Sequence, residues 1–177
     1  MSAGEYKYKI VMLGDFAVGK TSLVRRYVYD EFNDNYLTTI GVKVTKKSLQ
    51  LGEGGGSVDL LLWDIASDDM FGPMAAEYMR GCAGAIIVSD ITRRSTFDSL
   101  PEHVSTLLNV NPDAQYVFAV NKSDLADENR TLSAAADSYI VGSELLNKSA
   151  YFVTSAKDGR NVQKLFELLA VNLMKRS

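Results

Sequence analysis

The sequence predicts a single α/β domain over residues 1–177, with a mostly parallel six-stranded sheet, one antiparallel edge strand and helices on both faces. Two observations lead to this prediction. Short, nearly continuous apolar runs alternate with segments of helical periodicity, which is typical of a parallel sheet covered on both sides. Residues 44–64 break the alternation, because two extended segments there flank a glycine cluster, as in an antiparallel hairpin.

Five apolar runs have the length of strands, and the hairpin supplies a sixth. The runs are residues 8–13, 58–64, 85–90, 116–121 and 151–155. The last helix is expected to follow an N-cap at Asn161, with apolar residues at helical spacing: Val162, Leu165, Phe166, Leu169 and Leu173. Parallel sheets bind ligands at the carboxyl ends of their strands, so we look for functional residues there.

The composition excludes several classes of protein. Hydrophobic residues make up 46% and charged residues 23%, as in soluble globular domains, and no run approaches the length of a membrane span. A net charge of −3 offers no basic footprint for nucleic acid. The single cysteine, Cys82, precludes an internal disulfide and fits a reducing, cytoplasmic setting, where we expect it to be a small core residue.

The two ends of the sequence carry no recognisable targeting or lipidation signal. The start, MSAGEYKYK, lacks the apolar core of a signal peptide, and Ser2 stands where a myristoylated glycine would be. The final residues, NLMKRS, include no cysteine for prenylation. We therefore expect no membrane anchor in this chain, which would reach membranes through partners or a further tail. We also expect the protein to be a monomer.

The first expected strand is followed directly by GDFAVGKT, from Gly14 to Thr21. This stretch matches GxxxxGK[ST] in the strand, loop and helix context that a phosphate-binding loop requires. Its glycines let backbone N–H groups turn toward phosphates, Lys20 can reach the terminal phosphates, and the Thr21 hydroxyl can ligate Mg²⁺. The motif does not identify the base of the nucleotide, because kinases, ATPases and GTPases share this loop.

A second motif, NKSD, extends from Asn121 to Asp124 and closes an apolar strand. The Asp124 carboxylate can accept hydrogen bonds from the N1–H and the exocyclic amine of guanine, whereas adenine offers no such pair of donors. The tripeptide SAK, Ser155 to Lys157, ends the next strand. The two motifs together favour guanine. They disfavour an adenylate-using kinase, for which no acceptor-binding lid segment is visible.

Five motifs in order make the chain resemble a Ras-superfamily small GTPase, closest to the Rab branch, over essentially its full length. Besides the three above, YLTTIG at 36–41 resembles the first switch, and WDIASDD at 63–69 stands where the family has WDTAGQE. The segment DITRRSTFDSL at 90–100 is also similar to Rab sequences. The resemblance implies the P-loop NTPase fold of a small G domain, with GTP or GDP and Mg²⁺ as ligands.

The resemblance also implies roles for individual residues. Thr39 should close on Mg²⁺ and the γ-phosphate, Phe32 should pack against guanine, and Ala156 should contact the guanine oxygen through its backbone N–H. The residues expected to bind nucleotide are Phe16, Ala17, Val18, Gly19, Lys20, Thr21, Ser22, Phe32, Tyr36, Thr39, Asn121, Lys122, Asp124, Leu125, Ser155, Ala156 and Lys157. Those expected to hold Mg²⁺ are Thr21, Thr39 and, through water, Asp64. Those expected to act in hydrolysis are Lys20, Thr39, Ser67 and Asp68.

The second switch departs from the family pattern at Ser67 and Asp68, where the family has glycine and glutamine. The glycine gives its N–H to the γ-phosphate and the glutamine orients the attacking water. A serine would cost about 1 to 2 kcal/mol if the closed switch requires a left-handed backbone. An ionised Asp68 cannot donate a hydrogen bond and adds negative charge beside phosphate. We expect slow GTP hydrolysis, or, as the alternative, a GTP-binding interaction module that has lost hydrolysis.

Other readings of these residues stay open. Asp68 and Asp69 also fit a solvated helix start, since carboxylates favour helix N-termini, and a partner could supply the missing catalytic group. Phe16 occupies a place where the family usually has a small residue, so its ring either obstructs an activating protein's arginine or faces outward harmlessly. His103, the only histidine, is expected to have a surface or capping role.

Effector and regulator proteins are expected to bind through the switch regions. Trp63 and Tyr78 match aromatic places that Rab proteins use to contact effectors, whereas the third such place holds Val44. Packing of the two aromatic rings in the core is an equally good reading of the sequence.

Overall fold

The computed structural model describes residues 5–35, 37–50 and 56–177. Within them the strands form one six-stranded sheet in the order β2-β3-β1-β4-β5-β6, which confirms the predicted architecture. The strands are β1 Glu5–Gly14, β2 Val42–Gln50, β3 Ser57–Ile65, β4 Gly84–Asp90, β5 Gln115–Asn121 and β6 Tyr151–Val153. Only β2 runs antiparallel to its neighbour within these residues, and it forms one edge of the sheet.

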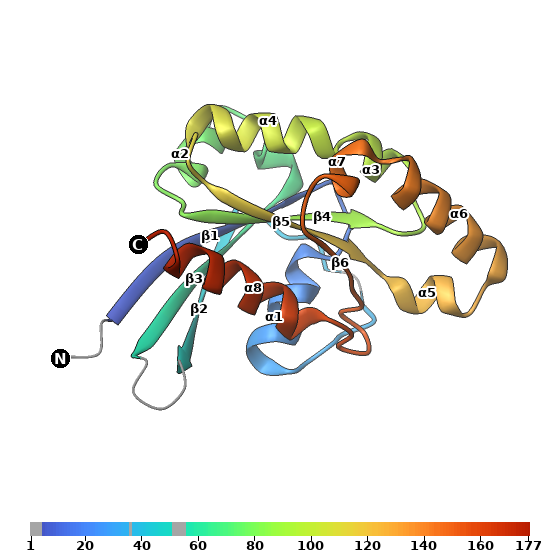
Figure 1. Cartoon of the computed structure of the whole chain (residues 1–177), viewed down its shortest axis with the longest axis horizontal. Helices are drawn as coiled ribbons and strands as arrows, with labels where there is room; N and C mark the ends of the chain where they lie inside the picture. Colours follow the sequence, from blue (N-terminus) through green and yellow to red (C-terminus); the bar gives the residue numbers. More distant parts are fainter. Residues whose placement is uncertain (1–4, 36, 51–55) are drawn as a thin grey trace.

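Helices cover both faces of the sheet (Figure 1). The helices are α1 Lys20–Tyr29, α2 Ala75–Met79, α3 Ser95–Asp98, α4 Leu100–Val110, α5 Ser123–Asp127, α6 Arg130–Gly142, α7 Glu144–Asn147 and α8 Val162–Met174, with one 3-10 turn, η1 Ser67–Asp69. α1 and α8 lie together on one face, and α2, α3 and α4 lie on the other (Figure 1). No described helix combines the length and the apolar character needed to cross a membrane.

The alternation of side chains along β1 divides the core between the two faces of the sheet. Ile10 and Met12 belong to the cluster beneath α1 and α8, while Val11 and Leu13 belong to the cluster beneath the opposite helices. This period of two is the geometry of an extended strand. Each fully buried side chain of this size contributes roughly 1.5–3 kcal/mol to the free energy of folding. Because its side chains are buried on both faces, β1 stabilises both layers of the core.

Two sequence expectations need correction near β6. This strand ends at Val153 rather than residue 155, and Thr154 still contacts β5: its backbone N–H donates to Val120 O at 2.8 Å and its hydroxyl to Asn121 Oδ1 at 3.1 Å. Asn161 does lie at the N-cap of α8, but its side chain makes no capping hydrogen bond. It donates instead to Val153 O at 2.8 Å, which secures the loop between β6 and α8.

Candidate functional site

A cavity of about 330 Å³ opens at the carboxyl ends of the parallel strands. The phosphate loop, the first switch, the NKSD loop and the SAK loop all contribute to its wall. The predicted nucleotide-binding residues that line it are Phe16, Ala17, Val18, Gly19, Lys20, Thr21, Ser22, Phe32, Thr39, Asn121, Lys122, Asp124, Leu125, Ala156 and Lys157. Tyr36 lies outside the described residues, and Ser155 does not form part of this wall.

Two glycines let the phosphate loop fold tightly against the ends of β4 and β5. Gly14 has φ +142°, and a Cβ there would come within 2.4 Å of Val88 O. Gly19 has φ +102°, and a Cβ there would come within 2.3 Å of Asn121 Nδ2. Both conformations and both approaches exclude a larger residue. The motif's glycines are therefore explained by contacts between the loop and the sheet.

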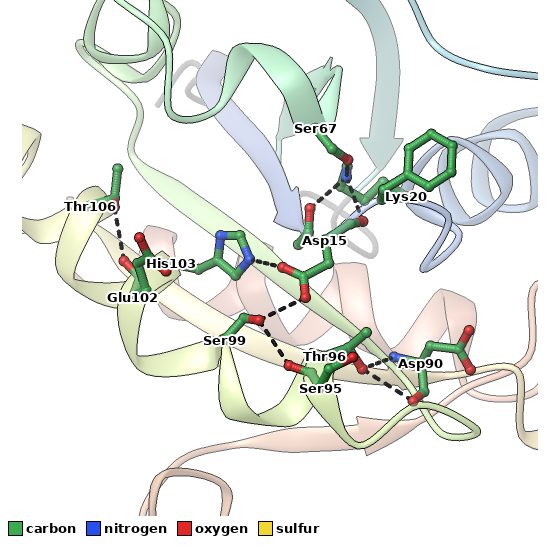
Figure 2. A network of polar contacts seen from close by, with 12 residues as sticks. Asp15, Lys20, Ser67, Asp90, Ser95, Thr96, Ser99, Glu102, His103 and Thr106 are labelled. Carbon is green, nitrogen blue, oxygen red and sulfur yellow. Dashed lines mark hydrogen bonds and ion pairs between the residues drawn. The ribbon is translucent and has the colours of Figure 1, made fainter.

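Lys20 is 7% exposed, and all three protons of its ammonium group have an acceptor. Its Nζ donates to Gly14 O at 2.7 Å, to Asp15 O at 3.1 Å and to Ser67 Oγ at 2.7 Å (Figure 2). Burial lowers the pKa of Lys20 to about 8, although Asp64 and Asp15 partly offset this effect. The lysine thus remains largely charged at neutral pH and connects the phosphate loop directly to η1.

The backbone of Ser67 does not adopt the left-handed conformation that the sequence analysis considered. The described non-glycine residues with positive φ are Ala17, Asp30, Lys122 and Asn161. Ser67 instead begins the 3-10 turn η1, so the expected cost of 1 to 2 kcal/mol does not arise in this conformation. Its neighbour Asp68 is exposed and lines the cavity.

The three residues predicted to hold Mg²⁺ lie together beside the cavity, although they are far apart in the sequence. Thr21 Oγ1 lies 2.6 Å from Thr39 Oγ1 and donates to Asp64 Oδ2 at 2.5 Å. Asp64 is 2% exposed, and burial raises the pKa of its carboxyl group. Its other oxygen, Oδ1, is buried and finds no hydrogen-bond partner among the described residues.

The residues expected to recognise guanine are connected to one another by hydrogen bonds. Asn121 Nδ2 donates to Val18 O at 3.0 Å, and its Oδ1 accepts from the backbone N–H of Ala156 at 3.3 Å. Ser155 Oγ donates to Asp124 Oδ1 at 2.7 Å. Ser155 therefore orients Asp124 rather than contributing to the cavity wall. The phosphate loop and the two base-recognition loops form one connected polar structure.

Sequence reasoning missed Arg26, a helix α1 residue that supports the SAK loop from outside. Its Nε donates to Ala156 O at 2.8 Å, and one guanidinium nitrogen donates to Lys157 O at 2.5 Å. The nearest sequence signal was only that Arg26 follows the phosphate-loop motif by one helical turn. The contact joins residues 130 positions apart, so no local pattern could have predicted it.

The expectation of a surface or capping role for His103 is wrong. His103 is 2% exposed and its Nε2 lies 2.8 Å from Asp15 Oδ1 (Figure 2). Ser99 Oγ donates to the other oxygen of the same carboxylate at 2.7 Å. The exposed ring of Phe71 lies beside the imidazole at a tilt of 32°, with the ring centroids 5.5 Å apart. His103 thus contacts both the phosphate loop and the second switch from α4.

The aromatic residues matched to Rab effector surfaces are half-buried and pack against the core. Trp63 and Tyr78 both border the core cluster beneath α2 and α4. Val44, which is 47% exposed, lies directly opposite Trp63 in the β2-β3 ladder. The ammonium of Lys9 lies 3.8 Å from the Trp63 ring centroid. Phe16, at the cavity rim, is 50% exposed.

Comparison with known proteins identifies the family to which the chain belongs. The family model described as Ras family matches residues 9–175. Among curated proteins, the chain is 36% identical to Ras-related protein RABA5e of Arabidopsis thaliana, covering 96% of this chain and 75% of that protein. It is 38% identical to GTP-binding protein ypt5 of Schizosaccharomyces pombe, with coverages of 93% and 77%, and 36% identical to Ras-related protein Rab-19 of Xenopus laevis, with coverages of 98% and 79%. The protein therefore belongs to the Ras family of small GTPases and is a Rab-like member of it.

Proposed function

We propose that this protein binds GTP and GDP with Mg²⁺ in the cavity, hydrolyses GTP slowly and exchanges partners between its two nucleotide states. The observation that carries the proposal is that Lys20, suited to phosphate, and Asp124, suited to guanine, line the same cavity. The printed name of the ypt5 relative, a GTP-binding protein, supports the same ligand. Membership of the Ras family supports a switch that hydrolyses GTP.

The nucleotide would occupy the cavity with its base over the NKSD and SAK loops. Asp124 would accept the two guanine donors and Phe32 would pack against the base. The Ala156 N–H, which donates to Asn121 Oδ1 at 3.3 Å, would be shared with or transferred to the guanine oxygen. Lys20 would exchange its bond to Ser67 for the terminal phosphates. Ammonium and backbone N–H donors are the groups that bind phosphate oxygens most strongly in such loops.

The oxygen donors beside the phosphate loop fit Mg²⁺. This cation takes hydroxyl, carboxylate and water oxygens together with phosphate, and a single carboxylate suffices for it. Thr21 and Thr39 would hold it directly and Asp64 through water; the partnerless, buried Asp64 Oδ1 supports this assignment. The cation would neutralise charge on the phosphates, while the described residues keep the two threonine hydroxyls aimed at one point.

Slow hydrolysis is proposed because position 68 of the second switch lacks a side chain that could both orient water and donate to a phosphoryl oxygen. Asp68 occupies the expected place, lines the cavity and carries a carboxylate. Positioning and charge stabilisation supply most of the catalysis in phosphoryl transfer. Phe16, half-exposed at the rim, would also obstruct an arginine approaching from an activating protein.

A second candidate function is a GTP-binding interaction module without turnover. The hydrogen bond from Lys20 Nζ to Ser67 Oγ favours this function. It holds η1 against the phosphate loop by a contact between two side chains of the protein, without a γ-phosphate. In either case effectors and regulators would meet the switch regions and the surface around Trp63 and Tyr78. We propose a cytoplasmic monomer in Rab-like trafficking or signalling that reaches membranes peripherally.

Calorimetric titration and single-turnover hydrolysis test the function together. The wild type should bind GDP and GTP in the presence of Mg²⁺, and Asp124→Ala and Lys20→Ala should each weaken binding by at least about tenfold, because each removes a charged hydrogen-bonding group. Unchanged GTP affinity in either variant would refute the assignment. Measurable phosphate release from bound GTP would support the switch, whereas persistent GTP would support the module.

A further inference from the structure

Asp90, the last residue of β4, lies between the two loops that are proposed to bind nucleotide. β4 pairs with β1 on one side and β5 on the other, so its carboxyl end faces both the phosphate loop after β1 and the NKSD loop after β5. The Asp90 side chain is only 2% exposed. A buried carboxylate of this kind must be fully hydrogen-bonded to be stable, so its partners indicate its role.

Four hydrogen bonds reach the Asp90 carboxylate. Oδ2 accepts from Lys122 Nζ at 2.8 Å and from Arg93 Nε at 3.0 Å. Oδ1 accepts from the backbone N–H and the hydroxyl of Thr92 at 2.9 and 2.7 Å. Burial alone would raise the pKa of Asp90, but the bonds from Lys122 and Thr92 more than offset burial and hold the pKa below its ordinary value. The group is therefore an anion at neutral pH.

The first connection from Asp90 runs through Arg93 to the phosphate loop. Arg93 uses its Nε for Asp90 and donates from another guanidinium nitrogen to Phe16 O at 2.7 Å. The planar guanidinium group thus joins the carboxylate to the backbone of the phosphate loop in a fixed geometry. Phe16 precedes Ala17, whose φ of +58° is left-handed, so the bond holds the loop where its backbone turns.

The second connection leads to the NKSD loop. Lys122 has φ +67°, a left-handed conformation that is unfavourable for a residue with a side chain. Its ammonium group is paired with Asp90, and the backbone N–H of Ile91 donates to Asn121 O at 2.9 Å. Asp90 thus holds the strained residue that stands two positions before Asp124.

The end of β4 is itself firmly anchored. The backbone N–H of Asp90 donates to Thr96 Oγ1 at 2.9 Å (Figure 2). That hydroxyl donates to Arg93 O at 2.7 Å. Thr96 is 1% exposed. The carboxylate therefore projects from a rigid strand end, which is what a group that positions two separate loops requires.

We propose that Asp90 is a positioning residue for nucleotide binding, which fixes the phosphate loop through Arg93 and the guanine-recognition loop through Lys122 relative to each other. The proposal rests on the proposed function for its consequence, since the fixed spacing of the two loops sets how the base and the phosphates are held together. Asn121 makes a direct bond to Val18 O, so Asp90 provides a second, independent connection between the same loops.

Asp90→Asn tests this proposal against a matched control. The control is Asp59→Asn, because Asp59 is also a buried carboxylate, with a side chain 5% exposed and paired with Lys46 at 2.6 Å, but it lies outside the cavity wall. Hydrogen exchange measured without nucleotide should become faster at the amides of residues 16–20 and 122–125 in Asp90→Asn and not in Asp59→Asn. Equal exchange in the two variants would overturn the proposal.

The dissociation rate of a fluorescent GDP analogue gives the functional readout. It should rise about tenfold in Asp90→Asn, the size expected from loss of a hydrogen bond to a charged group. Asp59→Asn should leave the rate unchanged even if it lowers the melting temperature. A wild type that binds no guanine nucleotide would refute the proposed function, whereas the exchange comparison would still decide the role of Asp90.

A double-mutant cycle with Arg93→Ala identifies the path to the phosphate loop. Arg93→Ala should accelerate exchange at residues 16–20 and leave residues 122–125 unchanged. Combining it with Asp90→Asn should add little further exchange at residues 16–20, because both changes interrupt one connection. Full additivity at the phosphate loop would show that Asp90 does not act through Arg93 and would overturn that arm of the proposal.

Discussion

At the scale of single residues, Ser67 and Asp68 give this pocket its departure from the pattern WDTAGQE. The Ser67 hydroxyl is an acceptor for Lys20, while Asp68 lies exposed at the cavity wall. The two side chains therefore affect different steps. We propose that Ser67 influences how readily Lys20 can bind phosphate, and that Asp68 influences the position of the attacking water.

Asp68→Gln should raise the single-turnover rate of GTP hydrolysis by roughly 10- to 100-fold, the size associated with gaining one well-placed donor in the transition state. Glutamine removes the negative charge beside the phosphates and can both orient water and donate a hydrogen bond. Asp69→Asn is the control, because Asp69 follows in the same turn and does not line the cavity. An unchanged rate in Asp68→Gln would mean that position 68 does not limit hydrolysis.

Ser67→Ala should raise the affinity for GDP by about three- to tenfold, because the lysine then gives up no side-chain hydrogen bond when it turns to phosphate. Titration calorimetry of wild type and variant at the same Mg²⁺ concentration measures the difference. Weaker binding in Ser67→Ala would indicate that the serine hydroxyl instead assists the nucleotide-bound form.

The sequence predicted the residues of the pocket where a contiguous motif encodes them, as in GDFAVGKT and NKSD. These motifs are local because backbone turns around a phosphate or a base need fixed neighbours. The partners that hold the motifs were missed. Asp15 and His103 are 88 positions apart and Arg93 and Phe16 are 77 apart, so their contacts depend on how β4 and α4 pack rather than on any pattern in the chain.

At the scale of elements, the β2-β3 hairpin is fastened by one buried carboxylate on its inner strand. Asp59 accepts from Ser48 Oγ at 2.6 Å and pairs with Lys46 Nζ at 2.6 Å, and Ser48 is its direct partner in the ladder. Hydrogen bonds from Lys46 and then Ser48 hold the pKa of Asp59 below its ordinary value of 3.8. The hairpin was predictable from its glycines, whereas this fastening was not.

The stability contributed by Asp59 should depend on pH. A carboxyl group whose pKa is lower in the folded state stabilises the fold above its unfolded pKa and loses this effect as the pH falls through the folded value. The difference in free energy of unfolding between wild type and Asp59→Asn should therefore be complete above about pH 4 and shrink progressively as the pH falls below that value. Urea unfolding at several pH values measures it; a constant difference would contradict the assignment.

At the scale of the whole molecule, the loops that line the cavity are held from both faces of the sheet. Arg26 on α1 supports the neighbouring SAK loop from one side, while Ser99 and His103 on α4 hold Asp15 from the other. Figure 2 shows the second of these connections running from α4 to Lys20 and Ser67. The two helical layers therefore have a common polar connection at the nucleotide pocket.

His103→Ala should lower the free energy of unfolding by about 1–3 kcal/mol, because it leaves a carboxylate oxygen of Asp15 without its partner and opens space in the core. The loss should be smaller than additive when combined with Asp15→Asn, and His103→Gln, which retains a donor, should recover part of it. Chemical denaturation of the four proteins provides the cycle. Strict additivity would mean that the two side chains stabilise the fold independently.

Trp63 is the sole tryptophan of the chain, and its position makes the protein its own optical reporter. The indole is adjacent in sequence to Asp64, lies opposite Val44 on β2 and has the Lys9 ammonium over its ring. A rearrangement of the second switch that displaces the adjacent Asp64 would change the polarity or the charge around this one fluorophore. Its emission should therefore follow nucleotide exchange and hydrolysis in real time, with no label attached and no second tryptophan to obscure the signal.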